Sequence, residues 1–459
     1  MRQVIKIFLL ALVLNGVIAA AASTATNGLV WRTTVDRVTA DIHGEALWPL
    51  LEDIAHQTGW HIFVEPEANR KTDVKFSDLP ASEALKKLLG DLNFAYVPKT
   101  NEADQLYVFM TSINHATQRV PGTTAVKPVL RKHLPNELLL KVKPGTDIEA
   151  LAKSLGAKII GRDDKSGIYR LQFADVAATD AALGQLKTNS DVEAVEYNYL
   201  LDRPVAAQKI DGAPGSAPVA LTLDAATAND PCHPVVGLID TPLQSLGSQL
   251  DPFILKPISV TGDTAAPATA TGPTHATSMA ETILRAVSQQ SSSSAVRILP
   301  VDVYGNSETA TTWNVALGVK AAVDGGATVL NMSLGGSTDS SILNGIIQQA
   351  QAKGVLIFAA AGNQPVDTQT FPAALPGVIA VAATQGSQLA PYSNFGSFIS
   401  MALPGASVVY LGNQAYVVQG TSPATAYASG IAAGYKGINC DPWPQIQTMM
   451  QQKFPVPKN

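Results

Sequence analysis

The C-terminal half of the chain alternates long apolar runs with stretches whose apolar spacing suits helices. The stretches between the runs, such as 311–326 and 340–354, carry apolar residues at helical intervals. Near-continuous apolar strands separated by helices are typical of a parallel sheet that is covered on both faces. The runs are PVVGLID (234–240), VRILPVDVY (296–304), ATVLNMSL (327–334), GVLIFAAAG (354–362) and GVIAVAAT (377–384).

The N-terminal half has shorter elements, which predict two small α+β units. In residues 36–112, strand-like runs flank two amphipathic stretches, 45–59 and 80–93, in the order β-α-β-β-α-β. Residues 134–203 repeat that order. The pattern therefore predicts an α/β domain with a parallel sheet, preceded by two small α+β domains.

Composition marks the boundary between these halves. Charged side chains become sparse after about residue 225, and segment 204–230 is rich in Ala, Gly and Pro, which indicates a flexible linker. We therefore expect the C-terminal domain to occupy residues 231–459. The net charge of -5 over 459 residues gives no reason to expect nucleic-acid binding.

The first residues are typical of a secretory signal peptide. A short basic start, MRQVIK, precedes an apolar core that ends in small residues, with a cleavage point near Ala22. We expect a signal peptide at 1–22 and an exported protein; the alternative is an uncleaved anchor helix. No later apolar run approaches the ~20 residues that a membrane-spanning helix needs.

Four polar residues stand where an α/β fold collects its reactive groups, at the carboxyl ends of strands or the starts of helices. Asp240 ends an apolar run, Asn363 follows another, His275 opens THATSMAETILRA, and Ser422 follows VVQGT. Each has a simpler interpretation as a turn or cap residue. Ser422 in particular suits an N-cap followed by a proline at the first helical position.

Serine chemistry would need a base, and the C-terminal domain offers few. From residue 225 onward there are two histidines, His233 and His275, and only His275 lies at a junction of a loop and a helix. Imidazole is the usual base because its pKa lies near the working pH, and a carboxylate then fixes its tautomer. If this domain performs serine chemistry, His275 is the expected base and Asp240 its partner.

The two cysteines, Cys232 and Cys440, lie near the two ends of the C-terminal domain. Export permits a disulfide between them, and two buried free thiols are the alternative. Acidic residues are too sparse in this domain to predict a calcium site, so we expect no metal and no cofactor.

The order Asp, His, Ser, together with the motifs around these residues, resembles the subtilase family of serine proteases. VVGLIDT resembles the Asp motif, THATSMAETI the His motif and GTSPATAYASG the Ser motif, while NMSLGG, AAAGN, FPA and YSNFG follow in the family's order. The resemblance covers about residues 232–453.

The resemblance implies a role for each matching residue. Asp240 orients the base, His275 is general base and then general acid, and Ser422 is the nucleophile. The side chain of Asn363 donates into the oxyanion hole beside the backbone N–H of Ser422. The residues expected to pair with an extended substrate and to line its pocket are Ser333, Leu334 and Gly335.

The motifs depart from the family pattern in three places. Pro242 and Ala276 stand where the family usually has glycine, and Glu281 replaces the glycine that often closes the His motif. In the Ser motif, Pro423 follows the expected nucleophile, and Ala426 stands where the family has its proline. Proline has no N–H, and alanine tolerates only a negative φ, so these changes leave an altered specificity or a loss of activity open.

The two N-terminal units carry resemblances of their own. Residues 134–203, with KVKPGTD and DVEAVEYN, look like the inhibitory propeptide of subtilases, which implies an intramolecular inhibitor. Residues 36–112 resemble the short N-terminal domain of secretins and TonB-dependent receptors, which implies an envelope protein partner in a Gram-negative bacterium.

We therefore expect an exported serine endopeptidase, periplasmic or secreted, that acts on proteins or peptides and is made as a self-processing zymogen. Its own cut is expected between about Leu200 and Ala228. The alternative is a catalytically impaired, subtilase-like protein that binds peptides or serves in periplasmic signalling or assembly.

Overall fold

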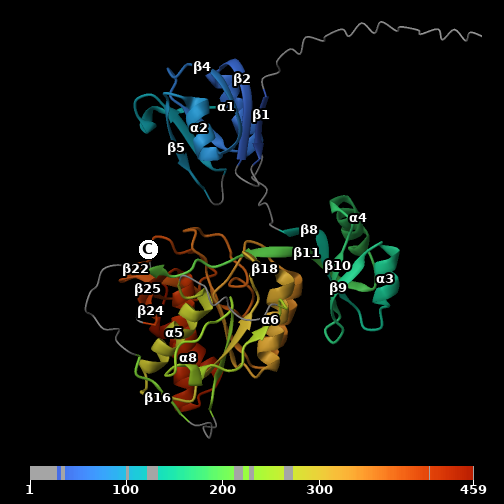
Figure 1. Cartoon of the computed structure of the whole chain (residues 1–459), viewed down its shortest axis with the longest axis vertical. Helices are drawn as coiled ribbons and strands as arrows, with labels where there is room; N and C mark the ends of the chain where they lie inside the picture. Colours follow the sequence, from blue (N-terminus) through green and yellow to red (C-terminus); the bar gives the residue numbers. More distant parts are fainter. Residues whose placement is uncertain are drawn as a thin grey trace, which may run out of the picture. The chain divides into compact units, whose positions relative to one another are not determined.

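The computed structural model describes residues 28–32, 37–99, 103–120, 133–210, 221–226, 232–262, 272–412 and 414–457. The expected signal peptide, residues 1–22, lies outside the described residues. The chain forms two compact units, Met1–Pro128 and Val129–Asn459, each with its own core (Figure 1).

The first unit contains two sheets and two helices. In α1 (Leu47–Thr58), the four apolar residues at helical spacing, Leu47, Leu50, Leu51 and Ile54, are all buried, as the pattern predicts. The other helix is α2 (Ala81–Leu89). One sheet consists, in spatial order, of β1 (Gly28–Arg32), β2 (Arg37–Ala46) and β4 (Lys71–Pro80). The other consists of β5 (Asn93–Val97), β6 (Gln105–Phe109), β3 (His61–Val64) and β7 (Gln118–Arg119).

The second unit begins with a small α+β module that has the expected order of elements. Its helices, α3 (Ile148–Ser154) and α4 (Val176–Leu186), begin at Asp147 and Asp175, whose side chains accept hydrogen bonds from the first turn. Its strands are β8 (His133–Val142), β9 (Lys158–Asp163), β10 (Ile168–Gln172) and β11 (Val192–Asp202).

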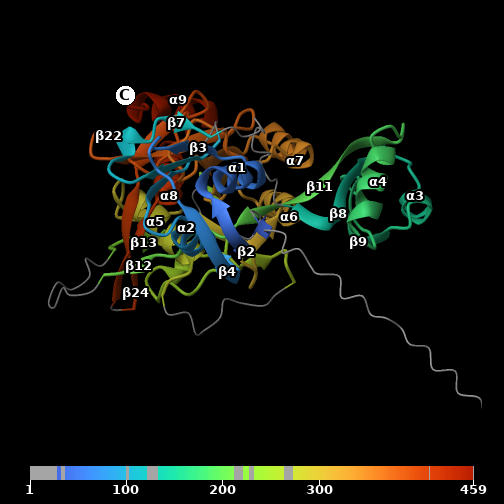
Figure 2. The same cartoon turned by 90° about the horizontal axis from the view of Figure 1, so that it is seen from above.

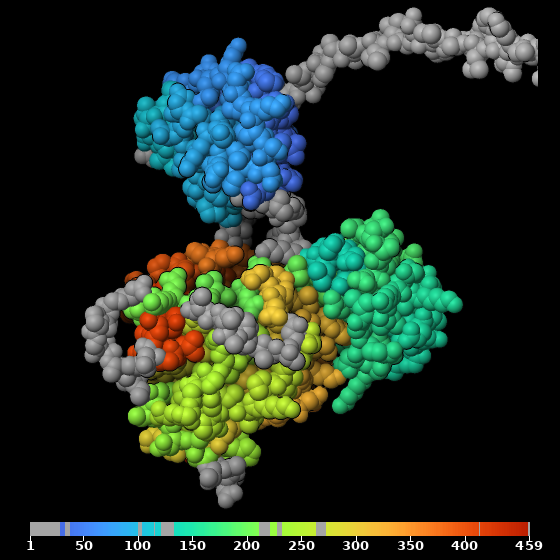
Figure 3. Space-filling view, in the orientation of Figure 1, coloured from blue at the N-terminus to red at the C-terminus, as the bar shows by residue number. Residues whose placement is uncertain are grey.

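Strand β11 reaches beyond this module into the C-terminal domain. Residues Leu200, Leu201 and Asp202 pair antiparallel with β18 (Thr309–Thr311), directly before α6 (Thr312–Asp324). Figure 2 shows β8 and β11 of the module beside α6, and the space-filling view in Figure 3 shows the module in contact with the C-terminal domain. The last strand of the module is therefore shared between two domains.

The C-terminal domain is built on an eight-stranded, mostly parallel sheet, which confirms the α/β prediction. Its strands, in spatial order, are β15 (Ile258–Ser259), β17 (Arg297–Asp302), β14 (Val235–Asp240), β19 (Val329–Met332), β20 (Leu356–Ala360), β21 (Ile379–Gln385) and β22 (Gln388–Leu389), with β23 (Met401–Pro404) also paired to β21. The five apolar runs of the sequence contain β14, β17, β19, β20 and the start of β21. Their burial on both faces explains why they are continuous rather than alternating.

Helices cover both faces of this sheet. Helices α5 (His275–Ser288) and α8 (Thr421–Asn439) contribute buried residues to one apolar core. Helices α6 and α7 (Ser341–Ala352) contribute to a second core. Helix α9 (Trp443–Lys453) packs against α8. Within the described part of the chain, no helix is both long and apolar enough to cross a membrane.

The segment expected to be a flexible linker is tied to the C-terminal domain at two places. Strand β12 (Gln208–Lys209) pairs with β25 (Gln414–Gln419), which forms a hairpin with β24 (Ala406–Leu411). Strand β13 (Asp224–Ala225) pairs with β16 (Ser293–Ser294). At these residues the chain is part of the folded domain, which composition alone does not reveal.

Candidate active site

The three side chains expected to act together come from three different elements. Asp240 is the last residue of β14, His275 is the first of α5, and Ser422 is the second of α8. Their exposed fractions are 0%, 4% and 7%, so all three are buried. Asp240 lies at the carboxyl end of a parallel strand, where an α/β fold places its reactive groups.

The carboxylate of Asp240 holds the imidazole of His275. His275 Nδ1 lies 2.8 Å from Asp240 Oδ2 and 2.9 Å from Oδ1. Because a carboxylate only accepts hydrogen bonds, Nδ1 carries a proton, and in the neutral imidazole the lone pair is then on Nε2. This is the tautomer that a general base requires.

Thr241 connects the aspartate to the histidine helix, a role that the sequence analysis missed. Its backbone N–H donates to Asp240 Oδ1 at 2.7 Å, and its Oγ1 accepts from the N–H of Ala276 at 3.0 Å. Ala276 lies in the first turn of α5 and is not among the residues with positive φ. Alanine in place of the family's glycine therefore causes no backbone strain here.

Pro242 lies in a turn that is anchored to α5 on both sides. Thr241 precedes it, and the N–H of Gln244 donates to Thr277 Oγ1 at 2.9 Å. Because these two contacts hold the turn, the N–H that Pro242 lacks is not needed to position Asp240.

Ser422 is not an N-cap, so that simpler interpretation is wrong. Gly420 is the N-cap of α8, and Ser422 and Pro423 are its second and third residues. Gly420 has a φ of 143°, and a Cβ there would lie 2.9 Å from Asn363 Nδ2. Only glycine suits both this positive φ and the close approach of Asn363. With Gly420 as the N-cap, Ser422 lies in the first turn of the helix.

Asn363 is oriented by Thr421, the residue before the serine. Its Oδ1 accepts from the backbone N–H of Thr421 at 2.7 Å and from Thr421 Oγ1 at 3.0 Å. These contacts leave the amide nitrogen Nδ2 directed toward Gly420, beside the start of α8. The position of Thr421 inside the Ser motif was the only signal for its role.

The segment after β19 lies against Ser422. The hydroxyl of Ser422 donates to the carbonyl of Ser333 at 3.3 Å, and Ser333 Oγ donates to the carbonyl of Ser422 at 3.1 Å. Leu334 is buried, and a Cβ on Gly335 would lie 2.7 Å from Thr370 Cγ2. Ser333 and Ser422 are thus joined by two hydrogen bonds, each from the side chain of one residue to the carbonyl of the other.

Glu281, the second departure within the His motif, joins α5 to the hairpin that leads to Ser422. Its Oε1 accepts from Arg285 Nη2 at 2.5 Å and its Oε2 from the N–H of Tyr410 at 2.7 Å. Burial raises the pKa of Glu281 above its usual value, although both contacts oppose the shift. A glycine here could not make this connection.

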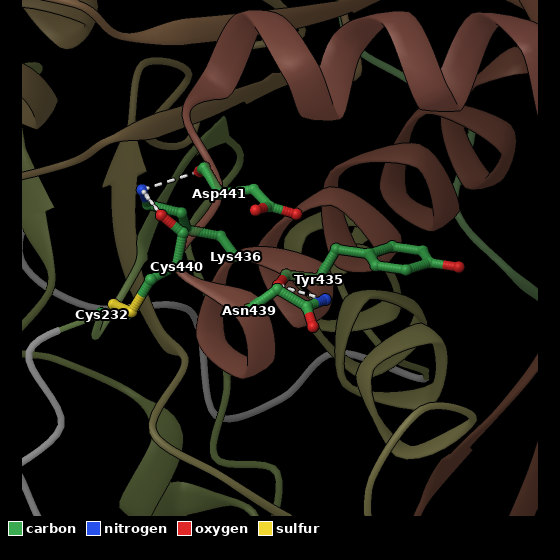
Figure 4. Close-up of a disulfide and its surroundings, with 6 residues drawn as sticks. All are labelled: Cys232, Tyr435, Lys436, Asn439, Cys440 and Asp441. Atoms are coloured by element: carbon green, nitrogen blue, oxygen red, sulfur yellow. Dashed lines mark hydrogen bonds between the residues drawn. A yellow bond between two sulfur atoms is a disulfide. The ribbon is translucent and has the colours of Figure 1, made fainter.

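The structure pairs Cys232 with Cys440 in a disulfide, with their Cα atoms 5.3 Å apart (Figure 4). Cys440 caps the C-terminal end of α8 in a left-handed conformation, and Lys436 Nζ donates to its carbonyl at 3.2 Å. The bridge links the end of α8 to the residues just before β14. Within the described residues, no three His, Cys, Asp or Glu side chains form a cluster that could hold a metal ion.

Two family models match the chain. Residues 233–453 match the subtilase family, and residues 121–198 match the fervidolysin N-terminal prodomain. Fervidolysin from Fervidobacterium pennivorans, described as a keratinolytic enzyme related to subtilisin, has a TM-score of 0.56 at 19% identity, over 69% of this chain and 57% of that chain. At this identity the likeness concerns the fold.

Curated relatives match shorter parts of the chain. Thermostable alkaline protease of Halalkalibacterium halodurans is 38% identical over 123 residues, which are 26% of this chain and 34% of that protein. Alkaline elastase YaB of Bacillus sp. is 35% identical over 155 residues, 33% of this chain and 41% of that protein. The chain thus spans about a third to two fifths of these relatives.

Subtilisin Savinase of Lederbergia lenta is matched more completely. It is 31% identical over 187 residues, which are 39% of this chain and 69% of that protein. Together with the family model that matches residues 233–453, this coverage shows that the chain belongs to the subtilase family.

Proposed function

We propose that residues 231–459 form a serine endopeptidase that hydrolyses peptide bonds through an acyl-enzyme. The observation that carries this proposal is the buried Asp240–His275 pair together with Ser422 in the first turn of α8. Membership of the subtilase family supports it, since the matched relatives are named as proteases and an elastase.

In the first step, the Ser422 hydroxyl turns from the Ser333 carbonyl to His275 Nε2 and gives up its proton as Oγ attacks the substrate carbonyl. Asp240 stabilises the imidazolium that forms. His275 then passes the proton to the leaving amine, and a water molecule hydrolyses the acyl-enzyme by the same route in reverse.

The developing oxyanion would accept hydrogen bonds from Asn363 Nδ2 and from the backbone N–H of Ser422. Both donors lie at the N-terminus of α8, where the helix dipole favours negative charge. Because Thr421 fixes the amide of Asn363, this donor needs no reorganisation during the reaction. An extended substrate would run beside Ser333, Leu334 and Gly335, which follow β19.

A fluorophosphonate probe tests the proposal directly. The full-length protein is treated before and after brief trypsin digestion, which can cut after the exposed Lys209. We expect labelling that is abolished by Ser422→Ala and by His275→Ala, and retained by Ser387→Ala, an exposed serine away from the site. A folded protein that is never labelled would instead be a subtilase-like binding protein.

We further propose that residues 134–203 act as an intramolecular inhibitor of this enzyme and make it a zymogen. The support is the contact that β11 makes with two helices of the C-terminal domain. Glu196 accepts hydrogen bonds from Ser340 and Ser341 at the start of α7, and Asn198 Oδ1 accepts from the N–H of Trp313 in α6. The match to a fervidolysin prodomain agrees with this role.

Export and an envelope partner form the last part of the proposal. The apolar start of the sequence supports a signal peptide at 1–22, and the resemblance to secretin and TonB-receptor domains suggests a protein partner for residues 36–112. Co-purification with and without residues 36–112 tests the partner. An identical set of co-purified proteins in both samples would refute it.

A further inference from the structure

The loop that carries Asn363 is bonded on both sides to one buried residue, Asn394. The loop follows β20, and Asn363 lies in it between Gly362 and Gln364. Asn394 belongs to the motif YSNFG (392–396), and only 3% of it is exposed. Neither the triad nor the substrate-binding segment accounts for a buried asparagine at this place.

Two hydrogen bonds join the loop to Asn394, one on each side of Asn363. The backbone N–H of Asn394 donates to the carbonyl of Gly362 at 2.9 Å, and the N–H of Gln364 donates to Asn394 Oδ1 at 2.8 Å. Because a backbone N–H only donates, the amide oxygen of Asn394 faces Gln364, and its Nδ2 is left to donate to Thr370 Oγ1 at 3.0 Å. The two neighbours of Asn363 are therefore both held by Asn394.

The backbone of the loop also packs closely against the Asn394 side chain. Gly362 has a φ of 107°, a conformation that favours glycine, and a Cβ there would lie 2.5 Å from Asn394 Nδ2. The same Cβ would lie 3.0 Å from Thr370 Oγ1. A change in the side chain of Asn394 therefore acts directly on the backbone that leads into Asn363.

Asn394 is itself fixed to the central sheet. Ser393 Oγ accepts from the N–H of Ala383 in β21 at 3.0 Å and donates to the carbonyl of Asn394 at 3.0 Å. On the other side of Asn394, the N–H of Phe395 donates to the carbonyl of Val366 at 2.9 Å. The support for the loop therefore comes from β21, a strand that carries no member of the triad.

Thr370 extends these contacts to the segment expected to bind substrate. The next residue, Phe371, exchanges two backbone hydrogen bonds with Gly336, at 2.8 and 2.9 Å. A Cβ on Gly335 would lie 2.7 Å from Thr370 Cγ2. The amide group of Asn394 thus joins the loop of Asn363 to the segment that follows β19.

We infer that Asn394 is a positioning residue, which holds the loop so that Asn363 Nδ2 is ready to donate to the oxyanion. The inference rests on the proposed peptidase function and deepens it, since it gives YSNFG the support of the oxyanion donor. Thr421 fixes the amide group of Asn363, and Asn394 fixes the backbone that carries it. Both contacts contribute, because a donor that is already in place stabilises the oxyanion without reorganisation.

The expected effect of losing Asn394 has an upper limit. Asn394→Ala keeps the backbone N–H that donates to Gly362, but it removes the acceptor for Gln364 and the donor to Thr370. Complete loss of an oxyanion donor costs about 10²- to 10³-fold in kcat, so a misplaced donor should cost less. We expect kcat to fall about 10- to 100-fold with KM little changed, because the donor acts in the transition state.

A double-mutant cycle separates positioning from a general loss of structure. Asn394→Ala is made in the wild-type full chain and in the Asn363→Asp chain, in which no Nδ2 donor remains to be positioned. Each protein is activated by brief trypsin digestion, its active sites are titrated with the fluorophosphonate probe, and kcat and KM are measured on a peptide without Lys or Arg, which trypsin does not cut. We expect the large fall in kcat only in the first background, and a change of less than about twofold in the second.

Thr370→Val gives the same test without changing Asn394. Valine keeps the size of the side chain but removes the oxygen that accepts from Asn394 Nδ2, so kcat should fall about threefold to tenfold in the wild-type chain. In the Asn363→Asp chain it should stay unchanged. The matched control is Asn344→Ala in α7, a partly exposed asparagine that accepts from Gln348 Nε2 at 3.3 Å, and it should leave kcat unchanged in both chains.

Two results would overturn the inference while the peptidase proposal stands. One is a wild-type kcat for Asn394→Ala; the other is an equal fall in kcat in both backgrounds, which would mean that Asn394 serves the fold rather than Asn363. If Asn394→Ala does not fold, Thr370→Val decides by the same criterion. If the wild-type chain neither cuts the peptide nor reacts with the probe, before or after trypsin, the peptidase proposal fails and this inference fails with it.

Discussion

Glu196 should account for much of the attachment between the prodomain-like module and α7. Its side chain is 7% exposed and accepts hydrogen bonds from Ser340 Oγ, from the backbone N–H of Ser341 at 2.8 Å and from Ser341 Oγ at 2.9 Å. An acidic group at a helix N-terminus is also favoured by the helix dipole. Glu196→Ala removes the acceptor of all three bonds.

The size of the effect follows from what replaces those bonds. Hydrogen bonds to a charged group contribute about 1.5–3 kcal/mol each before compensation. Ser341 is exposed, so water can satisfy its two donors, and Ser340 Oγ still accepts from Leu343 at 3.0 Å. Burial also raises the pKa of Glu196, which reduces the benefit of its charge. We therefore expect a net loss of about 2 kcal/mol, roughly 30-fold in the opening equilibrium.

Hydrogen exchange measures this opening directly. In an uncut full chain carrying Ser422→Ala, the amides of residues 341–345 should exchange about 30-fold faster after Glu196→Ala. The matched control is Glu193→Ala on the same strand, whose partially exposed pair with Lys141 should contribute less than about 1 kcal/mol. The reasoning is refuted if α7 exchanges at the wild-type rate, or if both variants have the same effect.

Three further changes have defined outcomes. Asn363→Asp keeps the acceptor for Thr421 but removes the Nδ2 donor, so kcat on a peptide substrate should fall about 10²- to 10³-fold with KM little changed; an equal change in both would contradict an oxyanion role. Replacing Cys232 and Cys440 together with serine should lower the free energy of unfolding by about 3–5 kcal/mol, seen as a lower urea midpoint, and an unchanged midpoint would show that the bridge does not stabilise the domain. Because its folded pKa is raised, Glu281 contributes stability that is present below the unfolded value of about 4.5 and lost as the pH rises through the folded pKa. Glu281→Gln should therefore reduce the fall in melting temperature as the pH rises above about 4.5, and a wild-type slope in the variant would count against this assignment.

The sequence predicted the large elements well because their signals are strong and local. Five short, continuous apolar runs separated by helical stretches favour buried strands, and the helical spacing of Leu47, Leu50, Leu51 and Ile54 buries one face of α1. The motif residues Asp240, His275 and Ser422 then lie at strand or helix ends, which is why their order pointed to one site.

The features that could not be predicted from the sequence depend on contacts between distant segments. Strands of two residues, such as β12 and β13, have no periodicity to detect, so composition alone suggested a flexible linker. Ser422 was open to an N-cap interpretation because the conformation of Gly420 is set by its approach to Asn363. The tolerance of Ala276 became clear only once its place in the first turn of α5 was known.

The bridge between Cys232 and Cys440 closes nearly the whole C-terminal domain into a covalent ring, since the two residues are 208 positions apart. A single break at any surface loop inside the ring opens it without releasing a fragment. For the peptidase proposed above, which could cut other copies of itself, this means that an accidental nick need not abolish activity. The pieces remain joined, and the parallel sheet can hold Asp240, His275 and Ser422 in register while the chain is no longer continuous.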